Sequence, residues 1–344
     1  MDSVTVFQEE NPSLENYWRS VVLFGNNVAS YKFALAKTLL ELIEQDKTHI
    51  TLEELAKPYS KHLCEHIAVS SKQATSRTSS FLVACRQYNE GTISSDNLIQ
   101  VTKSKGFNNV LDAFHHVNGA DLPVKFFEKT NINGTAGIVL TDDVYRLGEI
   151  KFEKNLTHEA EARWNLVETA WNLGVSVNTL SIKYDDKSDL FFVEDNKIRR
   201  RNITSVRAAL NGYQKGKCFY CFDDINVTND ATNSCDVDHF IPHTLQQYTN
   251  ANLDGVWNLV LSCEKCNRGD DGKFAKVPAL KYLERLSKRN DFLISSHHPL
   301  RETLMNQTGR TEAERHLFLQ SMYKKAKEYL IHTWETTEVQ QAIF

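Results

Sequence analysis

At 344 residues and 41% hydrophobic content, the chain is long enough for two folded domains that each have a buried core. A formal net charge of -4 excludes a globally basic surface, so any contact with nucleic acid has to come from local patches. No apolar run approaches the ~20 residues of a membrane-spanning helix, and the first residues lack a charged and apolar leader, so we expect a cytoplasmic protein without a membrane span.

The first part of the chain predicts a mostly helical domain. Thr51 and Glu54 form a capping box that opens a helix extending to Ile67. Apolar residues also recur at helical spacing in four other segments, at 17–24, 31–42, 76–88 and 108–117.

Two predicted hairpins and one further helix complete this domain. Residues 137–147 and 180–193 alternate around short polar turns, which is typical of hairpins, and an amphipathic helix is expected over 157–173. The polar stretch near Asp195 is the best boundary, because the charge pattern switches there. We therefore expect a domain over 1–196 that selects a target or a protein partner, followed by a second domain over 197–344.

The charge switch separates a cationic segment from an anionic one. Residues 197–217 contain seven basic residues and no acidic one, whereas 218–262 contain six aspartates and no lysine or arginine. This is the layout of a divalent-metal nuclease, although a solvated helix face beside an acidic loop has the same pattern. On the nuclease interpretation, the residues expected to contact phosphate are Arg199, Arg200, Arg201, Arg207, Lys215, Lys217, Arg268 and Lys273.

Two Cys-x-x-Cys pairs lie within the second domain. Cys218 and Cys221 form the first pair, and Cys263 and Cys266 form the second. Each pair can present two thiolates on one tight turn, and two such turns complete the tetrahedral sulfur shell of a structural Zn²⁺. A redox role would need only one pair. A fifth nearby thiol, Cys235, is expected to pack within a strand because the shell is already full.

Asp238 and His239 lie between the two pairs in an alternating run that favours a strand. Neighbouring side chains in a strand point to opposite faces, so both can serve one site only where the strand bends, and Pro242 makes such a bend plausible. A neutral imidazole can accept a proton from water, and a carboxylate can hold a hard cation. A lone histidine is more often structural than catalytic.

Residues 218–273 resemble the HNH, or ββα-metal, endonucleases in their four-cysteine zinc form. The resemblance is carried by the runs Val-Asp-His-x-x-Pro, Asn-x-Val-Leu and Cys-Asn-Arg-Gly. It implies that His239 is the general base and that Asp238 and Asn267 hold one Mg²⁺ or Mn²⁺ ion. It also implies that Asn258 braces the loop that orients the histidine. The chain departs from the family at 269–272, where Gly-Asp-Asp-Gly interrupts the helix that usually continues.

The expected protein is therefore of the α+β class, with an α-rich first domain carrying small hairpins and then a zinc-bound HNH unit with C-terminal helices. Its expected activity is hydrolysis of DNA phosphodiester bonds, and the resemblance suggests defence against foreign or phage DNA. Two alternatives remain open. One is a resolvase or repair nuclease for branched DNA, and the other is a zinc module that binds nucleic acid without cutting it.

Overall fold

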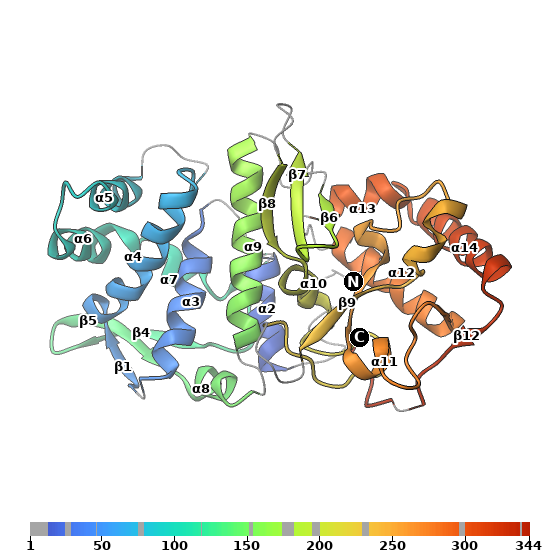
Figure 1. Ribbon diagram of the computed structural model, residues 1–344. Coiled ribbons are helices and arrows are strands. Elements are labelled where there is room, and N and C mark those ends of the chain that lie inside the picture. The colour runs from blue at the N-terminus through green and yellow to red at the C-terminus, as the bar shows by residue number, and fades with distance from the viewer. Residues whose placement is uncertain are drawn as a thin grey trace. The chain divides into compact units, whose positions relative to one another are not determined.

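The computed structural model of the protein contains two compact units, Pro12–Gly174 and Val175–Phe344. Both units contain helices and small sheets, so the expected α+β class is confirmed at this level (Figure 1). No helix of the described part of the chain is long and apolar enough to cross a membrane. The structure describes residues 13–24, 29–45, 47–74, 79–117, 119–150, 154–173, 182–194, 200–228, 234–295, 300–337 and 339–344.

The boundary between the units lies earlier than the polar stretch near Asp195. Strand β7 (Leu190–Glu194) pairs with β8 (Arg200–Ser205) across that stretch, and β6 (Lys183–Asp185) pairs with the other edge of β7. These antiparallel pairings join the predicted hairpin over 180–193 to the second unit. The sequence could not reveal this, because β8 lies in the basic segment that was expected to face DNA.

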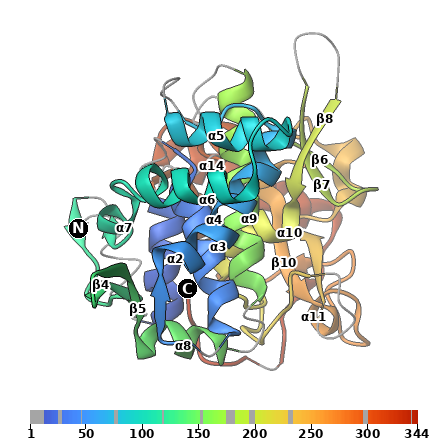
Figure 2. The ribbon, with the colours of Figure 1, turned by 90° about the vertical axis from the view of Figure 1, so that its left-hand side faces the viewer.

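The N-terminal unit is built mainly from helices. Helix α4 begins with the predicted capping box, in which Thr51 Oγ1 accepts from the Glu54 amide and the Glu54 carboxylate accepts from the Thr51 amide. Helices α5 and α6 pack against α4 and against each other (Figures 1 and 2). The helices are α2 (Leu14–Phe24), α3 (Tyr31–Ile43), α4 (Leu52–Val69), α5 (Ser80–Asn89), α6 (Ser95–Val101), the π-helical η1 (Thr102–Gly106), α7 (Val110–Ala113), α8 (Asp142–Gly148) and α9 (Lys154–Leu173).

A three-stranded sheet with the order β1-β5-β4 completes this unit, beside a short β2–β3 ladder. Strands β4 and β5 form a hairpin that turns at Asn133 and Gly134. Both residues have positive φ, as the tight two-residue turns of β-hairpins require. The expected hairpin over 137–147 is therefore wrong in its second arm, because Asp142 and Asp143 begin helix α8. The strands are β1 (His49–Thr51), β2 (His116–Val117), β3 (Ala120–Asp121), β4 (Phe127–Ile132) and β5 (Thr135–Leu140).

A buried ionic cluster joins α4 to α9. The His66 ring bonds Glu168 through Nδ1 at 2.8 Å and Glu161 through Nε2 at 3.2 Å. Its ring stacks on Trp164 with a centroid separation of 3.4 Å. Burial opposes the charged imidazole, but the two glutamates raise the pKa of His66 above its usual value. No local pattern in the sequence predicts this cluster, because its residues lie about a hundred positions apart.

The C-terminal unit places an antiparallel hairpin at its centre. Strands β9 (Cys235–His239) and β10 (Leu259–Cys263) pair in the register His239↔Leu259 to Cys235↔Cys263, and β9 falls where the alternating run at Asp238 and His239 predicts a strand. The short helix α11 (Glu264–Arg268) follows at once, and Gly269 is its C-cap residue. The remaining elements are α10 (Val206–Gln214), the 3₁₀ turns η3 (His243–Tyr248) and η4 (Val256–Asn258), β11 (Val277–Pro278), α12 (Leu280–Ser295), α13 (Arg301–Thr308), α14 (Glu312–Tyr329) and β12 (Thr333–Trp334).

Helix α12 supports this hairpin through one buried arginine. The Arg289 guanidinium donates to the carbonyls of Val256, Trp257 and Leu259 at 2.9–3.2 Å. These carbonyls belong to the turn that leads into β10. The C-terminal helices therefore fix the position of the strand that carries the second cysteine pair.

The first prediction concerns the β6–β8 sheet. A fragment beginning at Val175 should unfold cooperatively, whereas one beginning at Lys197 lacks β6 and β7. That loss removes the buried side chains of Phe191 and Val193, and it should lower the free energy of unfolding by about 3 kcal/mol or more. Urea denaturation of both fragments measures the difference. Equal stability of the two fragments would contradict the assignment of this sheet to the C-terminal unit.

Candidate metal centre and catalytic residues

The four paired cysteines converge on one point. The thiols of Cys218, Cys221, Cys263 and Cys266 all lie within 4.8 Å of one another, and Cys221 Sγ is 3.7 Å from Cys263 Sγ. A tetrahedron with Zn–S bonds of ~2.3 Å has edges of roughly 3.8 Å. The cluster thus has the ligand type, number and spacing of a structural zinc site, which is the fit that the sequence predicts.

Local backbone contacts preform this cluster. The Cys263 amide donates to Cys218 Sγ at 3.3 Å, and the Cys266 amide donates to Cys263 Sγ at 3.4 Å. The first turn is held to β10 because the Phe219 amide donates to the Leu261 carbonyl at 2.9 Å. Hydrogen bonds from backbone amides to sulfur stabilise the thiolate, which is the form that binds a metal.

Cys235 stands outside the cluster, as expected. It is fully buried in β9, and it is not one of the four thiols that lie within 4.8 Å of one another. Cys235 therefore packs as a small apolar side chain and offers a matched control for the four ligands.

Asp236 on β9 forms hydrogen bonds with two residues of α11. The Asn267 side-chain amide lies 3.1 Å from Asp236 Oδ2, and Arg268 Nε donates to the same oxygen at 3.0 Å. Asp236 keeps 20% of its side chain exposed. The structure thus places Asn267 beside Asp236, two positions before its expected partner Asp238.

Asp238 occupies a buried ion pair instead of an open site. Its Oδ1 accepts from Lys273 Nζ at 2.9 Å and its Oδ2 accepts from the Tyr220 hydroxyl at 2.6 Å. Lys273 is completely buried and also donates to the carbonyls of His239 and Phe274. Burial and the adjacent carboxylate raise the pKa of Tyr220 well above its usual value, so it remains a donor. Both oxygens of Asp238 are occupied, which differs from the expected metal ligand.

His239 points toward a different carboxylate. Its Nε2 lies 2.9 Å from Asp254 Oδ1, and His243 Nε2 approaches the same oxygen at 3.4 Å. The ring of Tyr184, on β6, lies 6.1 Å from the His239 ring. Asp238 and His239 therefore face opposite sides of β9, as alternation in a strand requires. Sequence reasoning missed Asp254 because it lies fifteen positions from His239 in a loop.

Asn258 braces the loop between β9 and β10 from within. Its Oδ1 accepts from the Ile241 amide at 2.8 Å, and its Nδ2 donates to the Ile241 and Leu253 carbonyls at 2.9 Å. The residue is fully buried. These three hydrogen bonds hold both ends of the segment 241–253, which carries His243. Asp254 follows this segment directly.

Most of the described cations expected to contact phosphate are engaged inside the protein. Lys273 is buried as above, and Lys215 is 6% exposed with its ammonium near the Ile343 carbonyl. Arg207 pairs with Asp189 and Lys217 with Asp224. Arg268 remains 59% exposed beside Asp236. Arg199 and the side chains of Arg200 and Arg201 lie outside the described part of the structure.

Comparison of the chain with protein-family models, curated proteins and solved structures finds no match. The chemistry therefore has to be argued from the residues themselves. One compact unit combines a tetrathiol cluster, a carboxylate–amide pair at Asp236 and Asn267, and a histidine oriented by Asp254. Such a set can hold a structural metal and a hard cation, and it can accept a proton from water.

The second prediction concerns the thiol cluster. The protein should contain one tightly bound zinc per chain, and folding of the C-terminal unit should depend on it by roughly 10 kcal/mol. Replacement of Cys218 or Cys266 by Ser should abolish zinc binding and soluble expression, whereas Cys235→Ser should retain the zinc. Elemental analysis of the purified proteins provides the measurement. Folded protein without zinc would refute the assignment.

The third prediction concerns the buried ion pair. Lys273→Met leaves the Asp238 carboxylate without its cation and should cost about 3–5 kcal/mol of unfolding free energy. Adding Asp238→Asn should recover part of this loss, since the amide is neutral and still accepts from Tyr220. A double-mutant cycle from thermal or urea unfolding measures the coupling. A loss below about 1 kcal/mol for Lys273→Met would show that the pair is not structural.

Proposed function

We propose that this protein is a metal-dependent endonuclease of the HNH type that hydrolyses phosphodiester bonds in DNA. The observation that carries the proposal is the juxtaposition in one hairpin–helix unit of three groups. These are the tetrathiol cluster, the His239–Asp254 pair and the Asp236–Asn267 pair. A binding module that does not cut would need the thiols for folding but would have no use for an oriented histidine.

His239 is the proposed general base. Its Nε2 hydrogen is accepted by Asp254, which selects the tautomer in which Nδ1 carries the free electron pair. Nδ1 has no hydrogen-bond partner among the described residues. A water molecule at Nδ1 can therefore lose a proton to the ring, and Asp254 stabilises the imidazolium that forms. The resulting hydroxide attacks the phosphorus atom, and the P–O bond to the leaving sugar oxygen breaks. The leaving oxygen takes up a proton from water, and the imidazolium releases its proton to the solvent.

Asp236 and Asn267 are the proposed ligands for a Mg²⁺ or Mn²⁺ ion. Both offer hard oxygen atoms at the junction of β9 and α11, and Asp236 is partly exposed, whereas Asp238 is buried with both oxygens bonded. Such an ion, when bound, stabilises the negative charge that builds up on the phosphate. Arg268, beside the pair, can bind the neighbouring phosphate.

The biological setting is proposed from the resemblance alone: defence against foreign or phage DNA, with the N-terminal unit choosing the target or a partner. The first alternative, a resolvase or repair nuclease, is distinguished by comparing cleavage of branched and linear DNA. The second, a zinc module that binds nucleic acid without cutting, predicts binding with no product under any divalent ion.

The fourth prediction tests the proposed base. His239→Ala should slow Mg²⁺-dependent nicking of supercoiled plasmid by about 10²-fold or more while DNA binding and zinc content are retained. His332→Ala, at an exposed histidine of the same unit, should cut at the parent rate. Agarose-gel kinetics provide the measurement. An unchanged rate for His239→Ala would exclude this mechanism.

The fifth prediction separates the two candidate carboxylates. Asp236→Ala and Asn267→Ala should raise the Mg²⁺ concentration needed for half-maximal cleavage, because each removes an oxygen ligand. Asp270→Ala, at an exposed aspartate one turn away, should leave it unchanged. If Asp236→Ala has no effect and Asp238→Asn raises the requirement instead, the ion lies on Asp238, as the family resemblance implies.

A further inference from the structure

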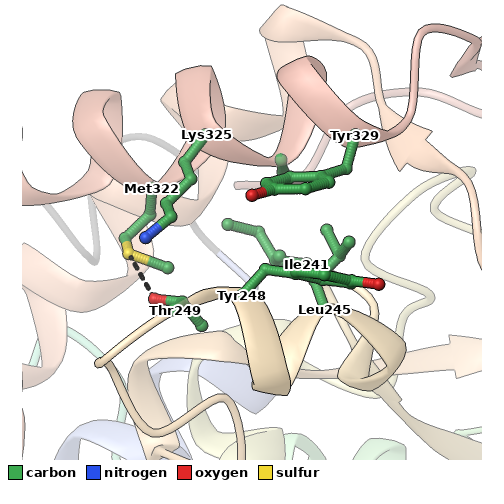
Figure 3. Close-up of a pocket in the computed structure, with 8 residues that line it drawn as sticks. Ile241, Leu245, Tyr248, Thr249, Met322, Lys325 and Tyr329 are labelled. Carbon is green, nitrogen blue, oxygen red and sulfur yellow. Dashed lines mark hydrogen bonds between the residues drawn. The ribbon is translucent and has the colours of Figure 1, made fainter.

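Two tyrosines form an exposed stack next to the loop that follows the proposed base. The Tyr248 and Tyr329 rings are nearly parallel, with centroids 4.4 Å apart and an interplanar angle of 22°. Figure 3 shows the rings one above the other, with their hydroxyl groups at opposite ends. Tyr248 is 43% exposed and Tyr329 is 50% exposed, which places both among the most exposed aromatic residues of the described chain.

The space between the surrounding side chains is too small to hold a ligand. It measures about 10 Å³, hardly room for one water molecule, and it is lined by Ile241, Leu245 and Met322. A small-molecule pocket is therefore excluded at this place. Anything that binds here has to lie on the outer surface of the stacked rings.

The charge around the stack favours an anionic ligand. Lys325 descends from α14 beside the rings, with its ammonium next to Met322 and Thr249 (Figure 3), and forms no ion pair with any described carboxylate. Lys324 lies next to it in the sequence and is exposed. The facing loop from Phe240 to Leu253 contains no acidic residue. An aromatic surface flanked by unpaired cations combines the two features with which proteins hold unpaired nucleotides, namely base stacking and phosphate contact.

The stack is tied to the proposed active site through one short segment. Ile241, two positions after His239, lines the small space beside the stacked rings. Helix η3 begins at His243 and ends at Tyr248. Tyr248 therefore lies nine positions after the proposed base, within a segment that Asn258 holds at Ile241 and at Leu253.

We infer that Tyr248 and Tyr329, with Lys325, hold an unpaired nucleotide of the DNA substrate. The inference rests on the proposed function and narrows its substrate class. In an intact duplex the base faces are covered by their neighbours, so stacking on a protein surface requires a base outside the helix. The favoured substrates are then duplexes that carry a single-stranded branch or end.

The test compares two DNA molecules that share one duplex, one blunt and one with a short single-stranded branch containing 2-aminopurine. Binding is measured by anisotropy, with His239→Ala as the background to prevent cleavage. Tyr329→Ala and Tyr248→Ala should weaken binding of the branched DNA about tenfold, since base–aromatic stacking contributes ~1–3 kcal/mol. They should leave the blunt duplex unaffected and reduce the quenching of 2-aminopurine. Tyr329→Phe should retain both signals, and Lys325→Ala should weaken the branched complex only.

Leu317→Ala, at an exposed leucine of the same helix, is the matched control and should change nothing. Equal binding of the branched DNA by Tyr329→Ala and its parent overturns the inference. So does an equal loss on both DNA molecules, which would show that the tyrosines only hold η3 against α14. Absence of binding to either DNA by the parent contradicts the proposed function itself, and this outcome is distinct from a failure of the stack alone.

Discussion

The convergence of four thiols is the constraint on which the rest of the C-terminal unit depends. One pair of cysteines precedes the β9–β10 hairpin and the other closes it, so a metal bound to all four joins the two ends of a segment of more than forty residues. Between the two cysteine pairs, the described residues form two strands and two 3₁₀ turns. A metal cross-link reduces the conformational entropy of such a segment when it is unfolded. Such a cross-link acts together with the buried side chains of Phe240, Ile241 and Leu253 to hold the loop between His239 and Asp254 in place.

Two polar devices then set the directions of the side chains on this hairpin. Lys273 bridges Asp238 and the His239 carbonyl in the interior, so the backbone of β9 is fixed at the point where the histidine leaves it. On the other side, the Asn258 side chain fixes the loop through three hydrogen bonds to the backbone. Strand alternation does the rest, because the His239 side chain must emerge on the face opposite to Asp238. The alternation of side chains along β9 therefore places the buried Asp238–Lys273 ion pair and the proposed His239–Asp254 dyad on opposite faces of the strand.

Local spacing explains what the sequence could predict. The cysteine pairs, the capping box at Thr51 and the strand at Asp238 each depend on residues a few positions apart, and all are present. The partners of the site residues depend on tertiary packing. The sequence offered no means of knowing that Asp254 would meet His239, that Asn267 would meet Asp236, or that Lys273 would be buried rather than exposed to phosphate. The residues after Thr141 are compatible with a second strand and with a helix that has Asp142 and Asp143 in its first turn.

The most direct test of the central claim is X-ray absorption at the zinc edge on the purified protein. A closed tetrathiol site predicts four sulfur ligands at ~2.3 Å, with no nitrogen or oxygen in the first shell. Cys235→Ser should give the same spectrum, because its thiol lies outside the cluster. A spectrum with nitrogen or oxygen ligands would show that the hairpin is not closed by the four cysteines. The placement of His239 would then need another cause.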